Sequence, residues 1–268
     1  MSRLTKTFKA LGILIRNPWK LNLVLNQNEE WERYIEKKYP FKHLPVIPFN
    51  SLVGNITVEP YAFLDGGSLP TDLALLKQLA SDIDDCRYFE IGTWRGESAA
   101  NVASSARVCY TLNLPENELK KYSDDRGFLA SQGIFSKSLS NVHHLCGDSS
   151  IFDFASLQMK FDLVFIDGDH HYESVVSDTG KVLQHLCHEN TVIVWHDYAY
   201  NPEQIRFEIL AAILDACPAD LHANIFHVEN TNCAILLRKP VSTHIFQKYA
   251  VPDHYFSVNI NNIRSNPK

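Results

Sequence analysis

Short apolar runs recur along residues 87–238, and segments of helical or polar pattern separate them. Runs that are apolar at nearly every position are typical of parallel strands, because helices cover both faces of such a sheet. Seven strands are predicted in this way, over residues 87–91, 108–114, 142–146, 161–166, 191–195, 224–228 and 233–238. Helical stretches lie between the first six, whereas only four residues join the last two, so these form an antiparallel hairpin. The pattern predicts an α/β fold with a doubly wound, mostly parallel seven-stranded sheet and a C-terminal antiparallel hairpin.

The first 70 residues follow a different pattern, which predicts a helical and irregular extension. Its first apolar residues recur at helical spacing among basic residues, until Pro18 interrupts them: Leu4, Phe8, Leu11 and Ile15. A second helix is predicted over residues 29–38, and three prolines between residues 40 and 48 indicate irregular structure. We therefore expect an extension over residues 1–70 (a lid or an oligomerisation segment), a sheet domain over residues 71–240 and a tail over residues 241–268.

The basic first segment leaves two interpretations open. Such a helix rests on an anionic membrane surface, or it packs on its own domain or on a second subunit. The first interpretation predicts a peripheral membrane contact through residues 1–20, and the second includes a homodimer. No apolar run approaches the ~20 residues that span a bilayer, and the apolar core over residues 10–15 is too short for a secretory signal. We expect a cytoplasmic protein.

Composition and charge exclude some partners. The chain is 45% hydrophobic and 21% charged, which is ordinary for a globular protein. A net charge of −6 argues against nucleic acid as a partner, because nucleic-acid binding requires a basic face. The six cysteines are scattered without a Cys-x-x-Cys pair, so buried free thiols in a reducing compartment are expected.

A glycine-containing turn follows the first predicted strand. Gly92 and Gly96 bracket it, and Glu97 opens the helical segment behind it. A strand that passes through glycines into a helix brings backbone N–H groups close to a ligand. This turn is therefore a candidate ligand loop.

Ionisable side chains crowd the ends of the fourth and fifth predicted strands. The fourth is followed by Asp167, Asp169, His170, His171 and Glu173, and the fifth by His196 and Asp197. Because neighbouring strand ends of a parallel sheet converge on one cleft, these groups are expected to face one another. One Asp alone is explained by helix capping and one His alone by the core, but so many together indicate a functional site.

The strand order, the segment Glu90-Ile-Gly-Thr-Trp-Arg-Gly96 and the segments 161–173 and 192–198 together resemble class I S-adenosylmethionine-dependent methyltransferases, which have a Rossmann-like fold. They resemble in particular the branch of small-molecule O-methyltransferases that often hold a divalent metal. The resemblance covers roughly residues 70–240. It implies that S-adenosylmethionine lies across the strand ends. The residues that would hold it are Glu90, Gly92, Thr93, Trp94, Gly96, Asn113, Asp148, Ser149, Asp167 and Gly168.

Two interpretations stay open for Glu90 and for the pair Asp148 and Ser149, and Asn113 departs from the family pattern. Glu90 organises the glycine turn or approaches the ammonium group of the cofactor. Asn113 stands where the family usually has an acid for the ribose hydroxyls; an amide still accepts one hydrogen bond and donates another. Asp148 and Ser149 meet the adenine, or one of them caps a short helix near residues 152–157.

The resemblance also implies the chemistry at the strand ends. By position, the metal ligands would be Asp167, His196 and Asp197, a set that suits manganese, iron or zinc better than magnesium. The metal would lower the pKa of a substrate hydroxyl. Without a metal, His196 or His170 would be the catalytic base, with Asp197 or Asp169 orienting the ring.

The function predicted from these residues is methylation of a small hydroxylated acceptor, such as a sugar or a phenolic compound. Two other hypotheses stay open. A nicotinamide-dependent oxidoreductase is disfavoured because the turn lacks Gly-x-Gly-x-x-Gly and the chain ends in a strand hairpin. A non-catalytic or regulatory binding protein with a decayed site would account for Asn113 and His196.

Overall fold

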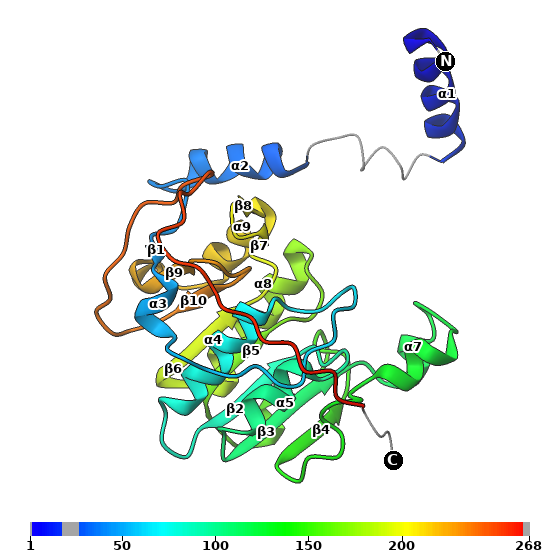
Figure 1. The fold of residues 1–268 in the computed structure, drawn as a ribbon. Helices are drawn as coiled ribbons and strands as arrows, with labels where there is room; N and C mark the ends of the chain where they lie inside the picture. The colour runs from blue at the N-terminus through cyan, green and yellow to red at the C-terminus, as the bar shows by residue number, and fades with distance from the viewer. Residues whose placement is uncertain (1, 18–26, 265–268) are drawn as a thin grey trace. The chain divides into compact units, whose positions relative to one another are not determined.

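The computed structural model describes residues 2–17 and 27–264, which fall into two compact units, Met1–Lys42 and His43–Lys268. The sheet belongs to the second unit (Figure 1). Residues 43–70, expected to be part of the N-terminal extension, therefore pack within the unit that contains the sheet. Among the described residues, no helix combines the length and the apolar character that crossing a membrane requires.

The first unit contains helices α1 (Arg3–Arg16) and α2 (Gln27–Lys38). The side chain of Ser2 caps α1 by accepting a hydrogen bond from the backbone N–H of Thr5. Helix α2 begins two residues before the predicted start, and both predicted helices are present. Pro18, which the sequence pattern treats as the end of the first helix, lies outside the described residues.

The second unit is built on an eight-stranded sheet with the order β1-β9-β10-β6-β5-β2-β3-β4. Its strands are β1 (Val46–Ile47), β2 (Arg87–Ile91), β3 (Val108–Asn113), β4 (Val142–Cys146), β5 (Phe161–Ile166), β6 (Cys187–Trp195), β9 (Ile225–Val228) and β10 (Ala234–Leu236). All neighbours are parallel except β10, which is antiparallel to both β6 and β9. The predicted α/β fold with its closing hairpin is thus confirmed.

Two features of the strands were not predicted. Strand β1 adds an eighth, edge strand, parallel to β9, between Pro45 and Pro48. Prolines that flank an edge strand interrupt no ladder, so this irregular-looking segment still pairs. A separate small hairpin of β7 (Ala199–Asn201) and β8 (Gln204–Ile205) follows β6.

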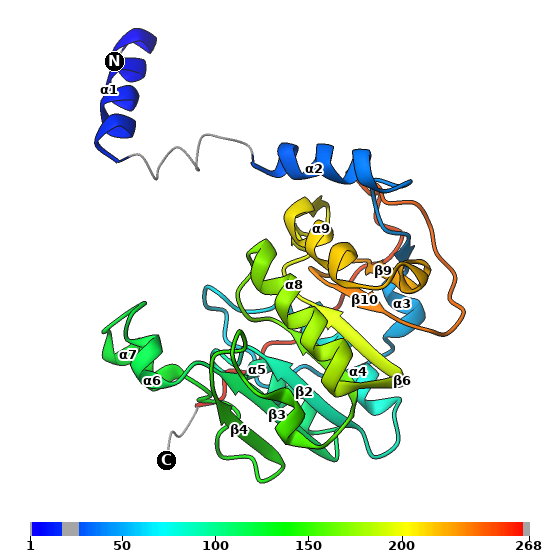
Figure 2. The same ribbon diagram turned by 180° about the vertical axis from the view of Figure 1, so that it is seen from behind.

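Helices cover both faces of the sheet. The helices of this unit are α3 (Phe49–Leu52), α4 (Pro70–Ser81), α5 (Glu97–Ala103), α6 (Glu116–Leu119), α7 (Arg126–Ser131), α8 (Tyr172–Lys181) and α9 (Phe207–Ala216). Two 3-10 turns, η2 (Phe154–Leu157) and η4 (Ala219–Asn224), and a π-helical turn, η3 (Val182–Leu186), accompany them. Helices α4 and α5 lie on one face (Figure 1), and α8 and α9 lie together on the other (Figure 2). The core on the α4 and α5 face includes Tyr88, Leu163, Phe165, Leu75 and Val102.

A buried polar cluster joins β2 to β3 and α5. Glu90 is fully buried in β2, and its Oε2 accepts a hydrogen bond of 2.7 Å from the hydroxyl of Tyr88. Burial raises the pKa of Glu90 from 4.5 to about 7, and the hydroxyls of Tyr88, Thr111 and Ser98 oppose part of that rise. Glu90 is therefore held by the protein beneath the turn that follows β2.

Replacing Glu90 by Gln should change how stability depends on pH. Because the folded-state pKa lies above 4.5, the proton stabilises the folded protein fully below pH 4.5 and this contribution is lost as the pH rises through about 7. Between pH 4.5 and about pH 8, the free energy of unfolding of the natural protein should fall by about 3 kcal/mol more than that of Glu90→Gln. Urea unfolding at several pH values measures this difference.

The exposed Glu189→Gln is the matched control, and its pH dependence should follow the natural protein. If the curve of Glu90→Gln ran parallel to that of the natural protein, Glu90 would not be titrating in this range.

Candidate active site

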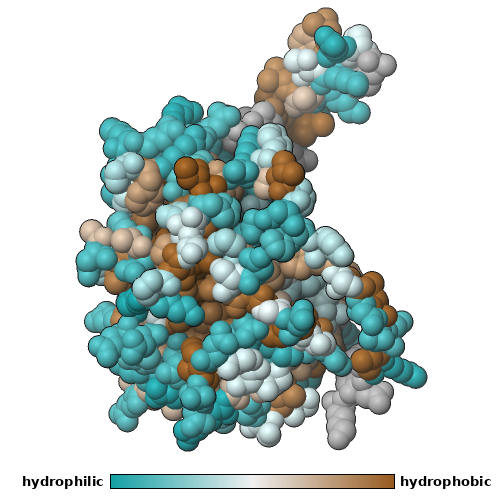
Figure 3. Space-filling model, turned by 60° about the vertical axis from the view of Figure 1, so that its left-hand side comes forward, coloured by the Kyte–Doolittle hydropathy of each residue, from teal (hydrophilic) through white to brown (hydrophobic). Residues whose placement is uncertain are grey.

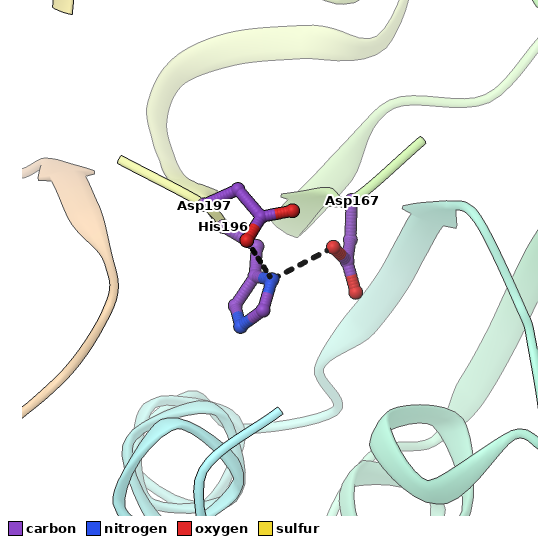
Figure 4. A group of neighbouring side chains, drawn as sticks. All are labelled: Asp167, His196 and Asp197. Carbon is purple, nitrogen blue, oxygen red and sulfur yellow. Dashed lines mark ion pairs between the residues drawn. The ribbon is translucent and has the colours of Figure 1, made fainter. Parts of the chain in front are cut away.

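The ends of β5 and β6 bring three ionisable side chains together (Figure 4). Asp167 follows β5, and His196 and Asp197 follow β6, whose last residue Trp195 is in register with Ile166. The backbone N–H of His196 donates to the carbonyl of Ile166 at 3.0 Å, which fixes the relation of the two strand ends. One ligand atom from each of the three side chains lies within 4.8 Å of the others.

His196 lies at the centre of this cluster. Its Nδ1 is 2.9 Å from Oδ1 of Asp167 and 3.7 Å from Oδ1 of Asp197. Its Nε2 lies 3.1 Å from Oδ2 of Asp72. The His196 side chain is only 8% exposed, whereas those of Asp167 and Asp197 are 27% and 31% exposed. The imidazole therefore stands between a buried carboxylate on one side and two partly open carboxylates on the other.

Asp72 is the functional residue that the sequence reasoning missed. It occupies the first turn of α4, is fully buried, and accepts hydrogen bonds from the backbone N–H groups of Leu69 at 2.7 Å and Asn232 at 2.8 Å. The Leu69 contact was predictable, because an acid at this position caps a helix. Nothing in the local pattern shows that the start of α4 faces the end of β6.

The charges around His196 decide its protonation. Burial lowers the pKa of His196, but the carboxylates of Asp167 and Asp72 outweigh that effect and hold the pKa well above the ordinary value of 6.5. Burial raises the pKa of Asp167, and the imidazole opposes the rise. The acids around His196 thus favour its protonated form, which disfavours it as a catalytic base.

His170 and Asp169 are not paired with each other. Nδ1 of His170 is 3.5 Å from Oδ2 of Asp197, and the ring is about half exposed. Asp169 instead binds Nδ1 of His171 at 2.5 Å and the hydroxyl of Ser174 at 2.7 Å. Of the two orienting acids considered, Asp197 is thus the one beside His170.

Arg206 is a second residue that the sequence reasoning missed. Its Nη1 lies 3.7 Å from Oδ1 of Asp197, and its Nη2 donates to the carbonyl oxygen of His170 at 3.3 Å. It immediately precedes α9 and gives no signal in the strand pattern. A small pocket opens at this place, lined by residues 166–170 and 195–197 and by Val175.

Contacts within the protein, which the sequence did not show, explain the two glycines of the turn after β2. Gly92 has φ +95°, and a Cβ there would lie 1.9 Å from the carbonyl oxygen of Asp167. Gly96 has φ +80°, and its Cβ would lie 2.1 Å from Oγ of Ser136. A side chain at either position would thus meet the protein itself, so the fold alone already requires glycine at both.

The other predicted cofactor residues of this turn also have protein partners. The hydroxyl of Thr93 pairs with that of Thr111, and both are buried. Trp94 has φ +44°, and its ring packs at 5.2 Å from that of Phe128. Gly168, after β5, lies against the side chain of Ile91, where a Cβ would be at 3.1 Å.

The ends of β3 and β4 place Asn113, Asp148 and Ser149. Nδ2 of Asn113 donates to Oε1 of Gln132 at 3.0 Å, which leaves its Oδ1 as an acceptor. Oδ1 of Asp148 accepts from the backbone of Ser150 at 2.8 Å, and hydrogen bonds from Ser150 lower the pKa of Asp148. The cap of η2 is Asp153, so neither Asp148 nor Ser149 caps this helix. The carbonyl of Ser149 accepts from Lys181 at 2.8 Å.

Comparison with known proteins gives one family match. The family model described as a methyltransferase domain matches residues 89–198, from β2 to the residues that follow β6. A curated relative is the uncharacterized protein R132 of Acanthamoeba polyphaga mimivirus, 24% identical over 141 residues. That alignment covers 48% of this chain and 61% of the relative, so the match spans less than two thirds of the viral protein.

Solved structures with a distant likeness are also methyltransferases by name. One is the methyltransferase PaMTH1 of Podospora anserina with bound SAH, 15% identical, covering 80% of this chain and 89% of that one with a TM-score of 0.46. Another is CalS11, a TDP-rhamnose 3′-O-methyltransferase of calicheamicin biosynthesis, 14% identical, covering 63% and 78% with a TM-score of 0.43. Over the β2 turn and the strand ends described above, the chain is thus similar to the family described as a methyltransferase domain.

Proposed function

We propose that this domain methylates a hydroxyl oxygen of a small acceptor, and that a divalent metal bound by Asp167, His196 and Asp197 assists the transfer. The observation that carries the proposal is the environment of His196. Its Nε2 lies against the buried Asp72, while its Nδ1 faces the two partly exposed carboxylates.

The donor set fits a divalent cation. Asp72 accepts two backbone N–H bonds, so it is an acceptor toward His196, and Nε2 must carry the proton. That leaves Nδ1 as the nitrogen that can offer a lone pair, and Nδ1 is a buried atom without a well-directed hydrogen bond among the described residues. A carboxylate behind a ligating histidine fixes its tautomer in many metal sites. Two carboxylates with one imidazole favour manganese, iron or zinc over magnesium.

Such a metal, when bound, supplies a Lewis acid that lowers the pKa of the acceptor hydroxyl. The remaining tasks fall to side chains of the chain itself. His170 is half exposed beside Asp197, so it is placed to accept the hydroxyl proton while Asp197 stabilises the resulting imidazolium. Nη1 of Arg206 lies 3.7 Å from the other carboxylate oxygen of Asp197, Oδ1, and balances the charge of that carboxylate.

The methyl donor would lie across the ends of β2, β3 and β4. Glu90 is fully buried beside the hydroxyls of Tyr88, Thr111 and Ser98, so it is placed to support the turn after β2 from below. Asn113, held by Gln132, presents Oδ1 to the ribose hydroxyls. The family match favours methyl transfer over nicotinamide-dependent oxidation, the other chemistry that a doubly wound sheet accommodates.

Replacing Asn113 by Ala should weaken the binding of S-adenosylhomocysteine about five- to tenfold, because one hydrogen bond to a ribose hydroxyl is lost. Isothermal titration calorimetry measures the affinity. Asn117→Ala, an exposed amide in the neighbouring α6, is the matched control and should bind like the natural protein. Equal affinity in the two variants would show that Asn113 does not contact the nucleoside, and binding of NAD in place of S-adenosylhomocysteine would contradict the proposed function.

The metal site makes a separate prediction. The natural protein should bind one Mn²⁺ by calorimetry, and Asp197→Asn should abolish this binding because a charged ligand is lost. Asp72→Asn should weaken it about 10- to 100-fold, since the orienting carboxylate is lost. Asp169→Asn, a neighbouring acid whose partners are His171 and Ser174, is the control and should keep the affinity of the natural protein.

Turnover, followed as S-adenosylhomocysteine release with a panel of sugar and phenolic acceptors, should stop in chelator and return with Mn²⁺. Full turnover in chelator would remove the metal from the proposal and leave methyl transfer intact. Absence of turnover with every hydroxyl acceptor, in a protein that binds Mn²⁺ and S-adenosylhomocysteine, would contradict O-methylation.

A further inference from the structure

Helix α1 carries an exposed apolar stripe. Leu4, Phe8, Leu11 and Ile15 follow one another at intervals of four, three and four residues, which places them on one side of the helix. Their exposed fractions are 70%, 67%, 52% and 72%, and no residue of α1 is buried. Figure 3 shows the apolar and polar surface of this helix side by side. The stripe is therefore available for a partner.

The segment that contains α1 is basic, whereas the remainder of the chain has a net negative charge. Arg3, Lys6, Lys9 and Arg16 lie around the stripe, and α1 has no acid in its first turn. Residues 1–28 hold five of the 25 Lys and Arg and none of the 31 Asp and Glu, which leaves a net charge of −11 on the other 240 residues. Residues 1–28 thus carry a net positive charge, whereas the rest of the chain taken together is acidic.

We infer that α1 binds the surface of a bilayer that contains anionic phospholipid. A helix of 14 residues is ~21 Å long, too short to cross a bilayer but long enough to lie in its interface. In that position the stripe enters the acyl boundary, and the basic side chains reach the phosphate groups. Two copies packed stripe to stripe would instead bring eight like charges together, which disfavours a second copy as the occupant.

The helix itself supports this inference. Gly12 lies in its interior, and glycine there lowers helix stability. An isolated helix of 14 residues has only marginal stability in water. Contact with a membrane interface would supply the stabilising packing that α1 lacks. The proposal does not rest on the proposed methylation reaction, since none of the α1 residues is among the site residues.

Vesicle co-sedimentation of the full chain tests the proposal. The natural protein should sediment with vesicles of phosphatidylcholine containing about a third phosphatidylglycerol at low salt, and remain in solution with pure phosphatidylcholine. Binding should fall at high salt because the charges are then screened. Phe8→Gln/Leu11→Gln, which keeps good helix formers, and Lys6→Glu/Lys9→Glu should each reduce binding at least about tenfold.

Matched controls carry the same changes elsewhere. Tyr255→Gln/Ile263→Gln removes two exposed apolar side chains from the C-terminal tail, and Lys239→Glu/Lys248→Glu reverses one exposed charge just before the tail and one within it. Both should bind vesicles like the natural protein, and all variants should keep its circular-dichroism spectrum and its urea-unfolding midpoint, which shows that they are folded. Failure of the natural protein to bind anionic vesicles would overturn the proposal, as would equal binding by the α1 variants. A dimer that Phe8→Gln/Leu11→Gln dissociates, seen by light scattering, would assign the stripe to a second copy and overturn it as well.

Discussion

The contact between Asp72 and His196 is the interaction on which the geometry of the site depends. Asp72 is fully buried, and a buried carboxylate must have its oxygens satisfied. Its partners come from three separate parts of the chain: Leu69 at the start of α4, Asn232 just before β10, and His196 at the end of β6. One carboxylate thus fixes a helix and two strands relative to one another. The orientation of the imidazole follows from this long-range packing and not from its own segment.

The same contact explains the charge of the cluster. Three carboxylates, Asp72, Asp167 and Asp197, surround one imidazole, and Arg206 is a further cation at 3.7 Å from Asp197. The acids keep the pKa of His196 high. A divalent cation held by Nδ1 of His196, Asp167 and Asp197 would supply the positive charge that the proton on His196 provides only in part. The same acids that disfavour His196 as a catalytic base therefore favour it as a metal ligand.

The sequence predicted the strands and helices whose apolar residues follow a regular pattern. It missed contacts between segments that lie far apart in the chain. The seven predicted strands were recognised as mostly apolar runs of five to seven residues, and such runs are visible locally. Strands β1 and β8 have two residues each and β7 has three, too few for any period to be visible. At the site, the convergence of Asp167 with His196 and Asp197 follows from strand order alone. The roles of Asp72 and Arg206 do not, because the first is also an ordinary helix cap and the second simply precedes a helix.

Asp167 connects the two halves of the site physically. Its carbonyl oxygen stands so close to Gly92 that only glycine fits, and its backbone N–H donates to Ile91 at 2.8 Å, while its carboxylate reaches His196 at 2.9 Å. The turn after β2 and the cluster at the end of β5 are therefore in contact through one residue. Methyl transfer requires the sulfonium carbon and the acceptor oxygen to be held in line at close range. If the donor lies on the β2 turn and the acceptor beside the cluster, the backbone contact of Asp167 with Gly92 sets the spacing between them, and any side chain at position 92 must disturb both at once.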